Sequence, residues 1–230
     1  KLAIGSLMKT TSRILHRIYR KVVKILLALN YDFQTWEAEP LPKGPKIFCS
    51  NHFSSSDAHF VTTLTDDVLH MVIGPGFSIP VIGSFLRWTE QIKALSKEDR
   101  KQVVSEAIRY LKKGESIYIF PEGMLNSQET LMDFKAGIAD IYLATECPII
   151  PIGLVSPKRR VRSKLSKTAG RTMTVVSRNY YANIGKPMHF PKALSCAKEQ
   201  YETSRKLILD ELRETIEGLI KEIKTDKFWS

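Results

Sequence analysis

The sequence predicts an α/β fold in which helices flank a mixed central sheet. Short apolar runs typical of buried strands alternate along the chain with segments whose apolar residues recur at helical spacing. The 230 residues are enough for one domain with a sizeable core. We divide the chain into an N-terminal amphipathic helix region, 1–30, and a globular domain, 31–230.

The first predicted element is a helix over 13–30, and the mildly apolar residues 2–8 could form a companion helix. Basic residues crowd the face opposite its apolar residues. The apolar set is Ile14, Leu15, Ile18, Val22, Ile25, Leu26 and Leu29, and the basic set is Arg13, Arg17, Arg20, Lys21 and Lys24. Such a helix either lies in a membrane interface or packs on the domain with its basic face in solvent. Its longest apolar run, 25–29, is too short to cross a bilayer.

The globular domain begins with a predicted connector over 31–46, which contains three prolines and a glycine. Strands are predicted at 47–49, 68–73, 116–119, 148–155 and 171–184. Helices are predicted after a Ser96 cap as far as Gly114, at 134–146 and at 197–224. Residues 158–164 are predicted to form a basic loop, which is either a solvated run of charges or a site that binds phosphate of a lipid headgroup or acyl donor.

A histidine and an aspartate follow the first core strand, in Ser50-Asn51-His52-Phe53-Ser54-Ser55-Ser56-Asp57. On a continuous helix the side chains of His52 and Asp57 would point about 140° apart, so they can meet only across a turn. A serine cap would leave His52 on the loop and Asp57 in the first turn of the following helix. The Asp57 carboxylate could then fix one imidazole nitrogen and leave the other free to take a proton. This is the geometry of a general base.

Other interpretations fit the same residues. His52 could be an ordinary packed or half-exposed histidine. His52, Asp57 and His59 could bind a metal, but no cysteine or second carboxylate at suitable spacing completes a three-ligand set, so no metal is expected. One of the three serines could be a nucleophile, although the chain lacks a Gly-x-Ser-x-Gly motif.

A second motif, Phe120-Pro121-Glu122-Gly123, directly follows the strand predicted at 116–119. Taken alone, it would be a tight turn. Ligands of open α/β sheets bind at the carboxyl ends of the strands. Because the His52 motif also follows a strand, we expect the two motifs to meet on one edge of the sheet.

Asn-His-x-x-x-x-Asp followed by Phe-Pro-Glu-Gly resembles the glycerolipid acyltransferase family, whose best-known member is 1-acylglycerol-3-phosphate acyltransferase. Each pattern should occur by chance in such a chain only at about the per cent level, so both in the family's order are specific. Further similar blocks are Ile79-Pro80-Val81-Ile82-Gly83, Phe134-Lys135-Ala136-Gly137 and Ile150-Pro151-Ile152. The resemblance runs from about residue 47 to residue 154.

The resemblance implies an acyltransferase with its catalytic domain in 31–230. His52, oriented by Asp57, would deprotonate an acceptor hydroxyl as it attacks an acyl thioester. The implied substrate-binding residues are Asn51, Pro121, Glu122, Gly123 and Lys135. Acyl-CoA or acyl-carrier protein would be the donor, a co-substrate and not a cofactor, and lysophosphatidic acid the acceptor, in phospholipid biosynthesis. Residues 79–88 would line an acyl-chain groove or belong to the core.

Two positions depart from the family. Its third block commonly continues Thr-Arg-Ser, whereas this chain reads Met124-Leu125-Asn126-Ser127, so a leucine replaces the arginine expected to bind an acceptor phosphate. The arginine common in the second block is also missing, around 93–96. Either Lys93, Arg87 or the basic loop at 158–164 takes over, or the acceptor is another lysolipid or amphiphilic hydroxyl.

The formal charge of +11 predicts an anionic partner. Nucleic acid is excluded because no stacking platform or recognition motif accompanies the basic residues. We expect an anionic membrane surface, with the protein peripheral or monotopic on the cytoplasmic face. The remaining alternative is a lipid-surface binding protein without catalytic activity. In such a protein, sequence drift should have replaced at least one of Asn51, His52, Asp57 and Glu122.

Overall fold

The structure is a computed structural model that describes residues 2–126, 128, 130–156, 160–166, 170–176, 179–191 and 198–226. Its α-helices are α1 (Leu2–Asn30), α2 (Asp57–Val61), α3 (Pro80–Trp88), α4 (Lys97–Lys112), α5 (Gly137–Thr145) and α6 (Lys198–Asp226), with a 3-10 helix, η1, at Pro75–Ser78. Its strands are β1 (Asp32–Glu37), β2 (Ile47–Ser50), β3 (Leu69–Ile73), β4 (Ile92–Lys93), β5 (Ser116–Ile119), β6 (Ile149–Val155), β7 (Arg160–Ser166), β8 (Gly170–Val176) and β9 (Asn179–Ile184).

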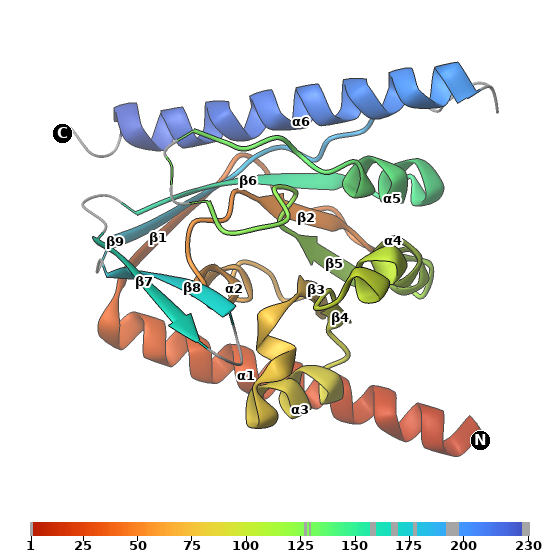
Figure 1. The fold of residues 1–230 in the computed structure, drawn as a ribbon, viewed down its shortest axis with the longest axis vertical. Coiled ribbons are helices and arrows are strands. Elements are labelled where there is room, and N and C mark those ends of the chain that lie inside the picture. The colour runs from red at the N-terminus through yellow and green to blue at the C-terminus, as the bar shows by residue number, and fades with distance from the viewer. Residues whose placement is uncertain are drawn as a thin grey trace.

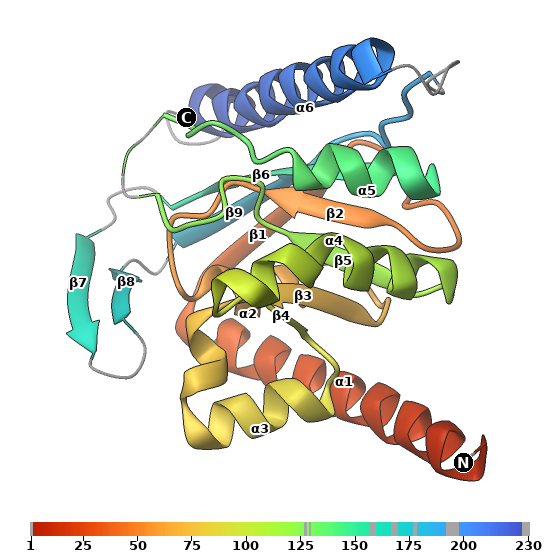
Figure 2. The ribbon, with the colours of Figure 1, turned by 45° about the vertical axis from the view of Figure 1, so that its right-hand side comes forward.

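A seven-stranded sheet in the order β1-β9-β6-β2-β5-β3-β4 occupies the middle of the protein (Figure 1). Its pairs are parallel except β6 with β9, which is antiparallel. Strands β7 and β8 form a separate two-stranded sheet that stands away from the larger one (Figure 2). The predicted mixed sheet flanked by helices is therefore confirmed.

Alternate residues of the central strands face two apolar cores. Ile47 and Cys49 of β2 pack in one core with residues of α4, α5 and α6, whereas Phe48 packs in the other with residues of α1 and α2. Figure 1 shows α6 and α1 on opposite sides of the sheet. Burial on both faces explains why these strands read as unbroken apolar runs in the sequence.

Three predictions about individual strands were wrong. The connector predicted at 31–46 contains β1, an edge strand that pairs in parallel with β9. The strand predicted at 171–184 is two strands in different sheets, β8 and β9. Within the predicted basic loop at 158–164, residues 160–164 belong to β7, which pairs antiparallel with β8. Lys158 and Arg159 lie outside the described residues.

Helix α1 is continuous over Leu2–Asn30, so it includes the predicted companion helix. Its residues Ser12, His16, Val23 and Leu27 are buried against the domain. The large apolar residues that stay exposed are Ile14, Ile18, Val22, Ile25, Leu26 and Leu29. We call these six the apolar face of α1. No helix in the described part of the chain is long and apolar enough to span a membrane.

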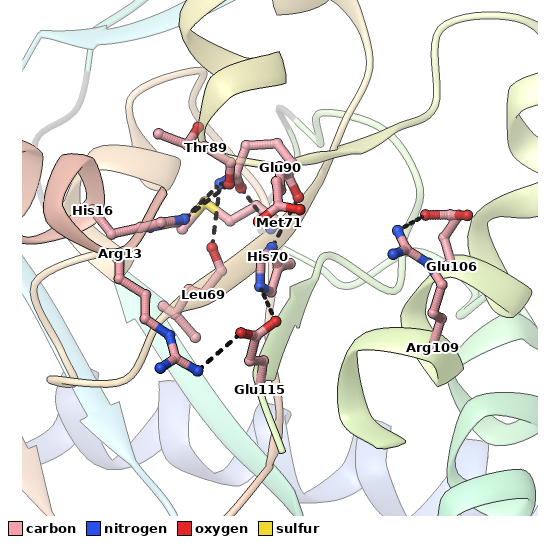
Figure 3. Close-up of polar contacts among 11 residues, drawn as sticks. Arg13, His16, Leu69, His70, Met71, Thr89, Glu90, Glu106, Arg109 and Glu115 are labelled. Carbon is pink, nitrogen blue, oxygen red and sulfur yellow. Dashed lines mark hydrogen bonds and ion pairs between the residues drawn. The ribbon is translucent and has the colours of Figure 1, made fainter. Parts of the chain in front are cut away.

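Polar side chains clamp α1 to the domain (Figure 3). Arg13 Nη2 lies 3.3 Å from Glu115 Oε1, and His16 Nε2 lies 2.9 Å from the Thr89 carbonyl oxygen. His70 of β3 joins the same cluster through Nε2, which lies 3.2 Å from Glu115 Oε2. Arg13 belongs to the predicted basic face, and in the structure it pairs with the domain while its side chain stays 57% exposed.

The burial of His16 in this cluster makes the free energy of unfolding depend on pH. Burial lowers the pKa of the His16 imidazole from 6.5 to about 4, although the hydrogen bond to the Thr89 carbonyl opposes the shift. Between these two pKa values the unfolded chain binds a proton that the folded protein does not, so the free energy of unfolding falls as the pH decreases from about 6.5 to about 4. We expect His16 to account for a loss of about 2 kcal/mol between pH 7 and pH 5.

Urea unfolding at the two pH values measures this loss. His16→Gln keeps a side-chain donor but does not titrate, so the variant should lose about 2 kcal/mol less than wild type over the same range. An equal loss in both proteins would contradict the assignment.

Candidate active site

The two polar motifs meet where two neighbouring parallel strands end. Strands β2 and β5 pair directly, so their carboxyl ends lie side by side. The backbone N–H of His52 donates to Glu122 Oε1 at 3.0 Å, and the backbone N–H of Asn126 donates to the His52 carbonyl oxygen at 2.7 Å. The loop after β5 thus holds the His52 peptide from both sides, and the prediction that the motifs share one edge is confirmed.

His52 and Asp57 are in hydrogen-bond contact across the turn. Nδ1 of His52 lies 2.9 Å from Asp57 Oδ2. The carboxylate only accepts, so Nδ1 carries the proton and Nε2 is left as the basic nitrogen. Within the described residues Nε2 has no hydrogen-bond partner, and the His52 side chain is 18% exposed. A substrate hydroxyl can therefore approach Nε2.

The turn is built around Asp57. Oδ2 also accepts hydrogen bonds from the backbone N–H groups of Phe53 and Ser54, at 2.8 and 2.9 Å. Asp57 is the first residue of α2, as predicted, but Ser56 at the helix start makes no side-chain capping hydrogen bond. The aspartate itself therefore closes the turn in place of a serine cap.

An aromatic ring fixes the plane of the imidazole. Phe120, the first residue of the second motif, stacks on His52 with ring centroids 3.8 Å apart and an angle of 16° between the planes. The stacking and the Nδ1 hydrogen bond leave the imidazole little freedom to rotate. Nε2 is thus pre-positioned, which reduces the reorganisation needed before proton transfer.

Two predicted substrate-binding residues contact protein groups in the structure. Asn51 bridges to β6, because its Nδ2 donates to the Leu154 carbonyl at 2.9 Å and its Oδ1 accepts from the Leu154 N–H at 2.8 Å. The Glu122 side chain is fully buried, and its Oε2 accepts from Asn126 Nδ2 and the Met132 N–H. Substrate contact by Asn51 and Glu122 stays a prediction.

Gly123 and Lys135 form the exposed rim beside this loop. Gly123 has a φ of +71°, which favours glycine, and a Cβ added there would lie 3.3 Å from Cγ of Lys135. The carbonyl oxygen of Pro121 accepts a hydrogen bond from the Lys135 N–H at 2.8 Å. The backbone of Lys135 is therefore held next to the second motif, and its ammonium group stays within one side-chain length of this motif.

The cations considered as replacements for the missing arginine lie in different places. Lys93 Nζ pairs with Asp99 Oδ2 at 3.2 Å, and Arg87 Nη2 donates to Ser84 Oγ at 3.1 Å. Leu125, which replaces the arginine of the family, is half-buried. Of the cations whose side chains are described, Lys135 is the one that packs on Gly123.

Sequence reasoning missed two residues of the site. Asn126 lies where the family has a serine, and its backbone and side chain bind His52 and Glu122. Tyr180 of β9 donates a hydrogen bond from its hydroxyl to Asp57 Oδ1. Local sequence carries no signal for the Tyr180 contact, because the two residues meet only through the order of the strands.

A cavity of about 560 Å³ lies elsewhere in the protein, lined by Lys24, Leu41, Lys46, Leu64 and Asp67 among others. Lys46 precedes β2 whereas His52 follows it, so the cavity opens at the amino ends of the strands. A volume of this order lies within the range of ligand-binding pockets. The hydrogen-bonding chemistry favours the opposite edge, because none of the residues that line the cavity belongs to either motif.

Both motifs lie within a match to a known protein family. The sequence profile of the family described as Acyltransferase matches residues 33–155, more than half of the chain. The chain belongs to the acyltransferase family. The match includes both motifs and excludes α1 and β9. The resemblance stated from the sequence is confirmed.

Two curated plant acyltransferases are similar in sequence. The chloroplastic 1-acyl-sn-glycerol-3-phosphate acyltransferase BAT2 of Brassica napus is 30% identical over 126 residues, which cover 54% of this chain and 37% of that protein. The corresponding LPAT1 of Arabidopsis thaliana is 28% identical over 159 residues, covering 67% and 43%. The chain thus matches about two fifths of the length of these relatives.

A solved acyltransferase has the same fold. The crystal structure of the 1-acyl-sn-glycerophosphate acyltransferase PlsC from Thermotoga maritima superimposes with a TM-score of 0.68 and 19% sequence identity. The alignment covers 99% of this chain and 90% of that one. At this identity the likeness establishes the fold.

Proposed function

We propose that the protein transfers a fatty acyl chain from an acyl thioester, acyl-CoA or acyl-carrier protein, to the hydroxyl of lysophosphatidic acid. The observation that carries the proposal is the buried Asp57 carboxylate bonded to His52 Nδ1, with Nε2 free beside the second motif. The plant relatives and PlsC, which are named as acyltransferases acting on 1-acylglycerol phosphates, support the choice of acceptor.

The geometry supports a direct transfer. Nε2 of His52 takes the proton of the acceptor hydroxyl as its oxygen attacks the thioester carbonyl carbon. The tetrahedral intermediate then collapses, the carbon–sulfur bond breaks, and the imidazolium returns the proton to the departing thiolate. An ester and a free thiol result. Asp57 stabilises the imidazolium between the two proton transfers, and no acyl-enzyme is needed.

Lys135 is our candidate for the contact with the acceptor phosphate. Its ammonium group can reach an anion beside Gly123 and could replace the missing arginine. Leu125 favours a second candidate, in which the same chemistry acts on another lysolipid or amphiphilic hydroxyl, because a leucine offers no hydrogen bond to phosphate.

Release of free thiol tests both candidates. Purified protein is given long-chain acyl-CoA or acyl-carrier protein together with lysophosphatidic acid, other lysophospholipids or a non-phosphorylated monoacylglycerol. We expect release that depends on lysophosphatidic acid. Release only with another acceptor would favour the second candidate, and none with any pair would leave a non-catalytic lipid-surface binding protein.

We further propose that the protein is peripheral or monotopic on an anionic membrane, on its cytoplasmic face. The apolar face of α1 supports this placement, together with the exposed Val81 and Trp88 of α3, which contacts α1. Exposed cations, including Arg17 and Lys21, border the apolar residues and would favour anionic lipids. Because α1 also contacts α2, the site would lie close to the lipid surface.

A negative charge introduced on this face tests membrane binding. We expect Ile25→Glu, at a residue 60% exposed, to lower the partition coefficient on anionic vesicles about tenfold or more, because it removes an apolar contact and adds a repelled charge. The control is Leu207→Glu on α6, which is 44% exposed on the opposite side of the sheet (Figure 1). Equal vesicle binding by wild type and both variants would exclude α1 as the contact surface.

A further inference from the structure

Tyr180 is a buried tyrosine of β9 that contacts Asp57, the partner of His52. In the sequence it lies outside the matched family region, 33–155. Its ring stacks on Phe60 of α2, with centroids 3.6 Å apart and 7° between the planes, and Phe33 meets it edge-on. The ring is therefore held rigidly between the sheet and α2. Its hydroxyl donates to Asp57 Oδ1.

The two oxygens of Asp57 are held in different ways. Oδ2 has three N–H donors, from His52, Phe53 and Ser54. Oδ1 has Tyr180 as its one donor among the described residues. Because Asp57 is 0% exposed, solvent cannot supply a substitute for this hydroxyl. The tyrosine stays protonated, since burial raises its pKa well above 10.0.

We propose that Tyr180 is a positioning residue for the acyl transfer proposed above: its hydroxyl fixes the Asp57 carboxylate and, through it, the orientation and basicity of His52. This inference rests on the proposed function for its kinetic consequence. The Oδ1 hydrogen bond fixes the rotation of the carboxylate about the Cβ–Cγ bond, so that Oδ2 stays directed at Nδ1. It also withdraws charge from the carboxylate, which limits how strongly Asp57 holds the imidazolium.

Tyr180→Phe removes only the hydroxyl and keeps the ring. We expect kcat to fall about tenfold, the scale on which loss of a hydrogen bond to a charged group acts, while KM for donor and acceptor stays within about twofold. Without the Tyr180 hydrogen bond, the Asp57 carboxylate stabilises the His52 imidazolium more strongly. The acidic limb of the pH–rate profile should therefore move to higher pH, by about half a pH unit or more.

Tyr181→Phe is the matched control. Tyr181 is the next residue of β9, and its ring stacks on Trp36 in a different cluster, away from Asp57. The Tyr181→Phe variant also loses one tyrosine hydroxyl from β9, and both its kcat and its pH–rate profile should remain those of wild type. Unchanged kinetics and profile in Tyr180→Phe would overturn the proposal, and so would a lower kcat with an unshifted profile, which a merely structural role would give.

A double-mutant cycle tests whether Tyr180 acts through the charge of Asp57. Asp57→Asn removes the charge on which Tyr180 acts, so Asp57→Asn with Tyr180→Phe should be no less active than Asp57→Asn alone. A further tenfold loss in the double variant would overturn the proposal.

Titration of the His52 imidazole by NMR separates this proposal from the proposed function. The pKa of His52 should be higher in Tyr180→Phe than in wild type, whether or not the protein transfers acyl chains. If wild type releases no thiol with any acceptor, the proposed function fails, and the titration alone decides the role of Tyr180. Equal titration curves would then overturn it.

Discussion

His52→Ala is expected to lower kcat/KM for acyl transfer about 100- to 10,000-fold, the usual contribution of a positioned general base. The variant loses the group that accepts the hydroxyl proton and returns it to the thiolate. The fold should persist, because Asp57 Oδ2 keeps the Phe53 and Ser54 N–H groups and because the His52 backbone contacts to the loop after β5 do not need the imidazole. The measurement is acceptor-dependent thiol release, with circular dichroism to check folding.

His189→Ala is the matched control for this experiment. His189 is exposed and follows Met188, which bridges to Ile149 at the amino end of β6, on the edge of the sheet opposite His52. This variant should retain wild-type transfer. Undiminished transfer by a folded His52→Ala variant would remove the general-base assignment.

The centre of the fold was predictable because its signals are local. The runs at 47–49, 116–119 and 148–155 are buried on both faces, and the Ser96 capping box marks the start of α4. The edges of the fold carry weaker signals. In β1, Phe33 and Trp36 are separated by two polar residues, so the strand breaks strict alternation, and its partner β9 lies far along the chain.

The same distinction applies to the site. The His52–Asp57 contact could be predicted from turn geometry, since five residues cannot bring the two side chains together in any other regular way. The hydrogen bonds from Asn51 to Leu154 and from Tyr180 to Asp57 could not, because each depends on which strands become neighbours. For Glu122 the sequence identified the residue, and the structure defines the groups around its carboxylate.

Glu122→Ala is expected to destabilise the protein by about 3 kcal/mol, because it leaves buried donors without an acceptor. The His52 and Met132 N–H groups would lose their carboxylate partner, and Asn126 Nδ2 would keep only the Thr130 carbonyl. Urea unfolding measures the loss. Glu214→Ala on the exposed surface of α6 is the control and should change stability by less than about 0.5 kcal/mol.

Glu122→Gln separates the two roles of this residue, because it keeps the size of the side chain and removes its charge. If Glu122 binds the acceptor hydroxyl, KM for the acceptor should rise while stability stays unchanged. The buried carboxylate and its protein partners lead us to expect the reverse, a lower kcat and lower stability with little change in KM. Glutamine has one acceptor oxygen, so its amide NH2 would face N–H donors at one of the two positions that the carboxylate oxygens occupy. A rise in acceptor KM alone would return Glu122 to the substrate-binding residues.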